Sequence, residues 1–186
     1  MKNHKTITLI TLTVLALVLT AFSYSPSQAA FDSGRGGPPN GRGRQVNSAQ
    51  NPITAALSEQ EAADLALAIQ EEYTAMNTYQ AIMGELGEIQ PFSQIARSEQ
   101  QHVNALIRVA QRFGVEIPEN AGLIADIEWT TFAEACQLGV TFEQMDADLY
   151  DQLLPNTTNA MLIRVYTNLQ RASLNNHLPA FEACNP

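Results

Sequence analysis

The stretch from Phe92 to Phe113, FSQIARSEQQHVNALIRVAQRF, decides the fold. Its apolar residues recur every three or four positions, which is the spacing of one helix face, and β-type alternation is absent. The expected inward row is Phe92, Ile95, Glu99, His102, Leu106, Val109 and Phe113. A carboxylate and an imidazole therefore occupy the middle of an otherwise apolar seam.

Three further segments have the same periodicity. The first opens with Ser58-Glu59-Gln60-Glu61, a capping box in which each side chain satisfies a free amide at the helix start. The last is expected to stop at Leu178, because Pro179 makes continuation costly. The expected helices span residues 58–86, 92–113, 131–154 and 157–178.

The connections between these helices predict their arrangement. Two are short, and the one from Gly114 to about Trp129 is long enough to cross the end of a bundle. We therefore expect an all-α fold, an antiparallel four-helix bundle with a long crossover between helices two and three.

The chain before residue 51 differs from the rest. Residues 1–29 combine early positive charge, an apolar run and a small-x-small ending, which predicts a cleaved signal peptide rather than a lasting membrane span. Residues 30–50 are rich in Gly, Pro and Arg without apolar periodicity, which is typical of a disordered linker. We expect an exported protein, periplasmic or extracellular, with one folded domain over residues 51–186.

The charge of that domain limits its partners. From residue 51 onward there are five Arg and eighteen Asp and Glu, a formal net charge of −13. Nucleic acid is excluded as an expected partner, because a phosphate backbone requires a basic surface. Metal ions are the natural complement, although most of these acids also serve to keep a surface soluble.

Acids recur on the inward rows of three helices. Glu72 lies on the first, Glu99 on the second, and Glu143 with Asp146 on the third. A buried acid costs several kcal/mol unless it is paired, protonated or coordinated. Four converging acids therefore predict a bound cation.

The spacing of these residues indicates the kind of ion. Glu99 and His102 form an E-x-x-H pair, and Glu143 and Asp146 form an E-x-x-D pair, so each pair shares a helix face. Carboxylates with one or two imidazoles suit iron or manganese. An isolated E-x-x-H also arises by chance, with the histidine only packing or capping. His102 and His177, the two histidines left after signal removal, both lie on inward rows.

These motifs resemble the ferritin-like superfamily, nearest to its rubrerythrin-type members. The segment Glu72 to Tyr79 resembles the first-helix pattern E-x-x-A-x-x-x-Y, and Ile95 to His102 resembles the second-helix pattern. The run Ser173 to Phe181 resembles a prokaryotic branch of ferritin-like domains with no assigned function. The likeness spans roughly residues 57–182 and implies a site for two iron ions, or manganese. The implied metal ligands are Glu72, Glu99, His102, Glu143, Asp146 and His177.

Two features depart from that pattern. Ser173 stands where the rubrerythrin pattern has a glutamate, so one metal lacks a ligand unless Asp146 or water replaces it. A turn at Pro155 to Thr158 also places His177 about 12 Å beyond the level of Glu143, as for a histidine that only packs near the bundle end. Ligation and packing of His177 both stay open.

The positions of the two cysteines along the bundle depend on those of Glu143 and His177. Cys136 precedes Glu143 by seven residues and Cys184 follows His177 by seven, so if those ligands are level the two thiols are level too. Export permits a disulfide, and the alternative is a buried free Cys136.

The expected function is a metal-binding protein whose di-iron site oxidises ferrous ion or reduces peroxide or oxygen. The alternatives are a non-catalytic metal-binding module and a purely structural helical bundle. The sequence leaves the oligomeric state open.

Overall fold

The protein is seen here in a computed structural model that describes residues 56–126 and 128–184. The expected signal peptide (1–29) and linker (30–50) lie outside these residues. Within them the chain forms helices and no strand, which confirms the all-α class. None of these helices is long and apolar enough to cross a membrane. The α-helices are α1 (Glu59–Leu86), α2 (Phe92–Phe113), α3 (Phe132–Leu153), α4 (Ala160–Ala172) and α5 (Leu178–Cys184).

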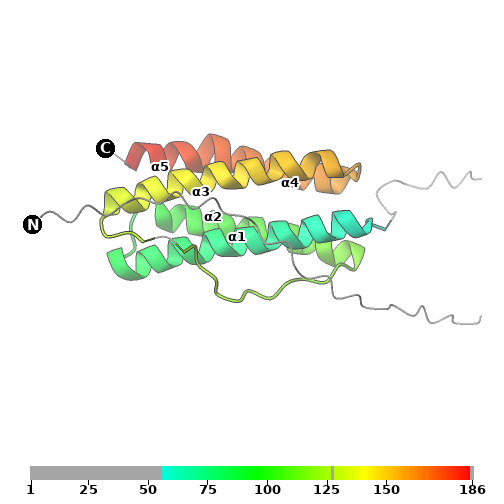
Figure 1. Ribbon diagram of the computed structural model, residues 1–186, viewed down its shortest axis with the longest axis horizontal. Helices are drawn as coiled ribbons and strands as arrows, with labels where there is room; N and C mark the ends of the chain where they lie inside the picture. Colours follow the sequence, from blue (N-terminus) through cyan, green and yellow to red (C-terminus); the bar gives the residue numbers. More distant parts are fainter. Residues whose placement is uncertain (1–55, 127, 185–186) are drawn as a thin grey trace, which may run out of the picture. The chain divides into compact units, whose positions relative to one another are not determined.

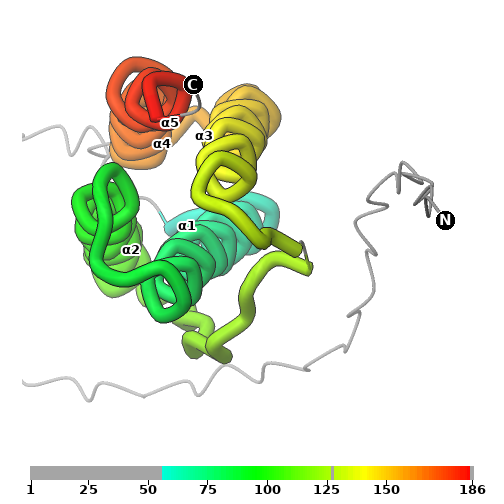
Figure 2. The backbone as a smooth tube through the Cα atoms, turned by 90° about the vertical axis from the view of Figure 1, so that its left-hand side faces the viewer, coloured from blue at the N-terminus to red at the C-terminus, as the bar shows by residue number. Residues whose placement is uncertain are grey.

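The helices form four columns (Figure 2), and α4 and α5 follow one another along the fourth. α1 lies beside α2 and α3, and α4 completes the square between α2 and α3. α1 and α2 run in opposite directions, as do α3 and α4 (Figure 1). The segment after α2 returns along the outside of α1 to the start of α3.

Local signals fix the helix ends. Ser58 and Thr131 cap α1 and α3 through capping boxes completed by Glu61 and Glu134. α2 ends at Gly114, whose left-handed φ of 69° suits a residue without a Cβ. The sequence predicted these three helices to within one residue at each end.

The fourth column differs from its prediction. α4 begins at Ala160 after the cap Asn159, and a π-helical segment, Ser173–His177, joins it to α5. The predicted end at Leu178 is therefore wrong. Pro179 is the second residue of α5, a first-turn position where the missing N–H costs little.

Two apolar clusters fill the bundle, one towards each end. Leu65, Leu106 and Tyr166 belong to the first, and Tyr79, Phe92 and Phe181 to the second. Along their helices, Glu72, Glu99, His102, Glu143 and His177 lie between the residues of one cluster and those of the other. The apolar core therefore encloses a charged layer on both sides.

Candidate metal centre

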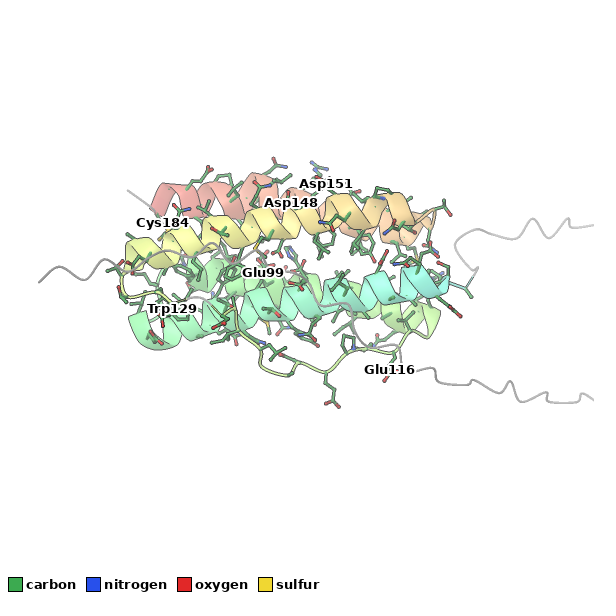
Figure 3. The ribbon with its side chains drawn as sticks, viewed as in Figure 1. Glu99, Glu116, Trp129, Asp148, Asp151 and Cys184 are labelled. Carbon is green, nitrogen blue, oxygen red and sulfur yellow. A yellow bond between two sulfur atoms is a disulfide. The ribbon has the colours of Figure 1, made fainter. Side chains whose placement is uncertain are left out.

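Five buried ligand-type side chains converge in that layer. Figure 3 shows Glu99 midway along the bundle, between the helices. The exposed fraction of each residue is below one tenth, so bulk water does not solvate the charges. The five residues, from all four columns, are Glu72 (α1), Glu99 and His102 (α2), Glu143 (α3) and His177 (π segment).

Glu72, Glu99 and His102 form the first of two triads. His102 Nδ1 lies 3.1 Å from Glu72 Oε2 and 2.7 Å from Glu99 Oε2. One ligand atom from each of the three residues lies within 4.8 Å of the other two, which is a spacing that a single ion can occupy.

Glu99, Glu143 and His177 form the second triad. His177 Nδ1 lies 3.0 Å from Glu99 Oε1 and 3.1 Å from Glu143 Oε2. The two oxygens of Glu99 therefore belong to different triads. A carboxylate placed in this way can bridge two ions.

The contacts of Glu99 are close without being hydrogen bonds. Both of its oxygens are buried, and neither has a hydrogen-bond partner, despite their distances of 2.7 and 3.0 Å from His102 and His177. Buried carboxylate oxygens are normally satisfied. The Nδ1 atoms of His102 and His177 instead hydrogen-bond to Glu72 Oε2 and Glu143 Oε2, which leaves both Glu99 oxygens available to a cation.

Two tyrosines hold the outer carboxylates. Tyr150 of α3 donates a hydrogen bond of 2.5 Å to Glu72 Oε1, and Tyr79 of α1 donates one of 2.7 Å to Glu143 Oε1. Each bond uses the oxygen that does not face a histidine. Each triad thus consists of a tyrosine-held glutamate, a histidine and one half of Glu99.

Ser98 contacts the far side of both imidazoles. Its Oγ lies 2.9 Å from His177 Nε2 and 3.5 Å from His102 Nε2. The two rings stack, with centroids 5.3 Å apart. A partner at Nε2 favours the tautomer that leaves Nδ1 free to bind a metal.

The carboxylates control the proton affinity of the histidines. Burial alone would lower the pKa of His102, but Glu72 and Glu99 outweigh it and raise the pKa to about 11. Burial acts in the same direction on His177, while Glu143 and Glu99 raise its pKa to about 9. Without a metal, both imidazoles therefore hold a proton at neutral pH.

The pKa values of the glutamates are separated by the same interactions. Burial raises the pKa of Glu72 to about 7, assisted by the charge of Glu99 and opposed by His102. Burial would also raise the pKa of Glu99, but its contacts with His102 and His177 lower it to about 2. Burial raises the pKa of Glu143, with Glu99 adding to the effect. Among these three glutamates, Glu99 alone has a lowered pKa.

Asp146 is buried beside this cluster but belongs to neither triad. Its Oδ2 is enclosed and has no hydrogen-bond partner. Burial raises its pKa well above the ordinary value, and Glu72, Glu143 and Glu99 add to that rise. Ser173, at the position of the absent glutamate, is buried and donates to the backbone carbonyl of Leu169 at 3.4 Å.

His177 lies level with Glu143, so the offset of about 12 Å expected from helix geometry is wrong. That expectation assumed one regular helix directly after the turn. The fourth column departs from that assumption in two places: a short 3₁₀ helix, Leu154–Asn156, precedes it, and the π segment interrupts it before α5.

A disulfide joins Cys136 of α3 to Cys184 of α5, with their Cα atoms 5.9 Å apart. Figure 3 shows Cys184 near the end of the bundle. The bond lies seven residues from both Glu143 and His177. The disulfide therefore crosslinks the two helical segments that carry Glu143 and His177 of the second triad.

Sequence reasoning assigned no role to Tyr79, Tyr150 or Ser98. Both tyrosines are buried, and a buried hydroxyl needs a polar partner, so a Tyr at helical spacing from the inward acids was a usable signal. Ser98 lies beside Glu99 in the chain, but its contact with His177 spans 79 residues. No local pattern reveals such a contact.

Comparisons with known proteins identify relatives without a stated function. The profile of a family described as an uncharacterized protein domain, DUF2202, matches residues 61–184. A crystal structure of the hypothetical protein MJ0754 from Methanococcus jannaschii DSM 2661 is similar in fold, with a TM-score of 0.63 and 24% identity. The alignment covers 70% of this chain and 82% of that one. No curated protein sequence matches.

Proposed function

Because the chain belongs to the DUF2202 family of uncharacterized domains, its function must be inferred from the site, and we propose a ferritin-like bundle that binds two metal ions. Glu99 bridges the ions. Glu72 and His102 complete one position, and Glu143 and His177 complete the other. Each position binds through the Nδ1 atom of its histidine.

The geometry of Glu99 supports this proposal most directly. A buried carboxylate with two oxygens of unsatisfied hydrogen-bonding capacity is expensive in a protein interior. Its cost is explained if each oxygen binds a cation. The structural-bundle alternative balances the charge of Glu99 through ion pairs with His102 and His177 but leaves both oxygens without a hydrogen bond.

The charge of the layer fits two divalent ions. The triad glutamates, Glu72, Glu99 and Glu143, carry three negative charges when all are ionised, and neutral imidazoles add none. Two divalent cations offset these three charges and leave a net charge of one. Oxygen-rich ligands with imidazole, and no cysteine thiolate, favour iron or manganese.

We propose a redox role for this pair of ions. A carboxylate-bridged di-iron site supplies one electron from each ferrous ion to an oxidant. With two ferrous ions bound, the site would supply two electrons, which with two protons would convert one O₂ to one H₂O₂ or, in a separate turnover, one H₂O₂ to two H₂O. The protein's residues hold the ions, and the apolar clusters exclude water around them.

The proposed compartment is the exterior or periplasm. The Cys136–Cys184 disulfide supports this proposal, because such bonds persist in oxidising surroundings. The signal-peptide pattern of residues 1–29 agrees with it.

An anaerobic ferrous titration followed by admission of oxygen tests the function. We expect two Fe²⁺ per chain and uptake of one O₂ per two Fe²⁺. Glu99→Gln should lose tight binding, whereas Glu85→Gln, an exposed change on the same helix as Glu72, should bind normally. Binding without oxygen uptake would establish the non-catalytic alternative. Absence of binding by the wild type would refute the metal site itself.

A further inference from the structure

The charges of this bundle are divided between its two sides. α1 carries six acids and α3 carries five, and neither helix has a lysine or arginine. α2 carries one acid, Glu99, and α4 carries none. All five arginines from residue 51 onward lie on α2 and α4.

This division gives the bundle an acidic and a basic side. α1 and α3 are neighbours on one side, and α2 and α4 on the other (Figure 2). A cation is drawn to the first and repelled from the second. The boundary between α1 and α3 is therefore the electrostatically favourable way into the buried cluster.

The buried Tyr150–Glu72 and Tyr79–Glu143 hydrogen bonds cross this boundary at the level of the cluster, and contacts of α1 with its neighbours close it at one place on either side. Asn156, just after α3, donates a hydrogen bond of 3.1 Å to Asp64 Oδ2. Ala125 of the crossover donates one of 3.0 Å to Thr78 Oγ1. Glu71 lies on the same face of α1, seven residues from each closure.

Small residues surround the position between these closures. Ala68 and Ala75, one turn before and after Glu71, are buried, as is Ala147 on α3. Alanines leave little side-chain volume between the two helix backbones. Glu71 itself is half-buried, so it reaches both solvent and the boundary.

Asp146 links this position to the cluster. It is buried to more than nine tenths, and its enclosed Oδ2 has no hydrogen-bond partner. The carboxylates whose charges act on Asp146 are Glu72, Glu143, Glu99 and Glu71. Asp146 is therefore within electrostatic range of both the half-buried Glu71 and the glutamates of the two triads.

We propose that divalent cations reach the cluster between α1 and α3 by passing from Glu71 to Asp146, which form a transient cation-binding position. This proposal rests on the proposed metal site. It assigns Glu71 and Asp146 to the path of the ion and not to its final coordination.

The path has a kinetic signature that a ligand lacks. A group that stabilises an ion in transit lowers the same barrier for arrival and departure. Its removal slows association and dissociation by the same factor and leaves the dissociation constant unchanged. Removal of a ligand instead weakens binding and speeds departure.

Stopped-flow binding of Co²⁺ tests this signature, with dissociation followed after mixing the loaded protein with excess EDTA. We expect Glu71→Gln and Asp146→Asn to slow both rates by about tenfold, the scale of electrostatic guidance. Glu85→Gln removes a negative charge from an exposed position of α1. Arg171→Gln removes a positive charge from an exposed position of α4, on the opposite side. Both controls should stay within about twofold of the wild type.

Three outcomes would overturn the proposal. If Co²⁺ associates with and dissociates from Glu71→Gln at the same rates as Glu85→Gln, Glu71 is not on the path, although the metal site itself is not refuted. Faster Co²⁺ release from Asp146→Asn, with weaker binding, would make Asp146 a ligand. Wild-type protein that takes up no Co²⁺ would refute the path together with the site.

Discussion

The hydroxyl of Tyr150 on α3 lies 2.5 Å from Glu72 Oε1 on α1, across 78 residues of sequence. Tyr79 and Glu143 repeat the relationship with the helices exchanged. The two bonds join α1 to α3 at the level of the cluster. They fix the outer carboxylates in orientations that leave one oxygen facing each histidine.

Removal of either hydroxyl should weaken metal binding. We expect Tyr150→Phe and Tyr79→Phe each to lower affinity for Co²⁺ by about tenfold, because residues that orient ligands have effects of this size. A competitive titration against a chromophoric chelator measures the change. Tyr166→Phe is the matched control, since the buried Tyr166 hydroxyl has no hydrogen-bond partner in the described part of the chain. Equal affinity in all three variants would contradict the role of the two bonds.

Gly139 should not tolerate a side chain. A Cβ at this position of α3 would overlap the ring of Phe181 on α5. We expect Gly139→Ala to lower the free energy of unfolding by about 1–3 kcal/mol, the usual cost of overpacking. Gly84 has open space around it within α1, so Gly84→Ala should stabilise by about 0.5–1 kcal/mol. Urea unfolding of both variants measures the difference, and equal effects would show that α5 does not pack as described.

Metal binding should release protons. His102 and His177, with pKa values of about 11 and 9, are protonated at pH 7.5 and must become neutral to bind an ion. Because these pKa values are raised on folding, the histidines stabilise the metal-free protein fully at pH values below their unfolded pKa of about 6.5. This contribution is lost as the pH rises through 9 and beyond. Affinity for metal should therefore increase from pH 6 to 9.

Calorimetric titrations of Co²⁺ in buffers of different ionisation enthalpy count these protons. We expect about two protons released from the histidines when both positions fill at pH 7.5. Glu72, with its pKa of about 7, should add a fraction of a proton. A release near zero would mean that the ions bind elsewhere.

The disulfide should contribute to stability and to the site. Replacement of Cys136 and Cys184 by serine removes a crosslink between residues 48 positions apart. The restored entropy of the unfolded chain should lower the free energy of unfolding by about 4 kcal/mol. Affinity at the His177 triad should also fall, because α5 follows the π segment directly. Urea unfolding and Co²⁺ titration of the double variant measure both effects. Unfolding at the wild-type urea concentration would contradict the crosslink.

The sequence predicted the first three helices well because caps and glycines mark their ends. The Ser58 and Thr131 capping boxes and Gly114 act on a few neighbouring residues, so local patterns suffice. The fourth column was predicted less well. Its π segment spans five residues inside an otherwise α-helical column, and no residue pattern between Ser173 and His177 predicts it.

The candidate site divides in a similar way. Glu72, Glu99, His102, Glu143 and His177 were found because ionisable groups on apolar rows are conspicuous, and the structure brings all five together. It places Asp146 beside them, outside both triads. Glu143 and Asp146 have the same three-residue spacing as Glu99 and His102, which share a triad, so helix periodicity alone does not separate a ligand from its neighbour.

Anomalous scattering from crystals soaked in Co²⁺ tests the bridging role of Glu99 most directly. Two strong peaks are expected inside the bundle, about 3.5–4 Å apart as in other two-metal sites, with one Glu99 oxygen directed at each. The first should contact Glu72 and His102, and the second Glu143 and His177. A bundle interior without a peak, or peaks confined to surface carboxylates, would contradict the account.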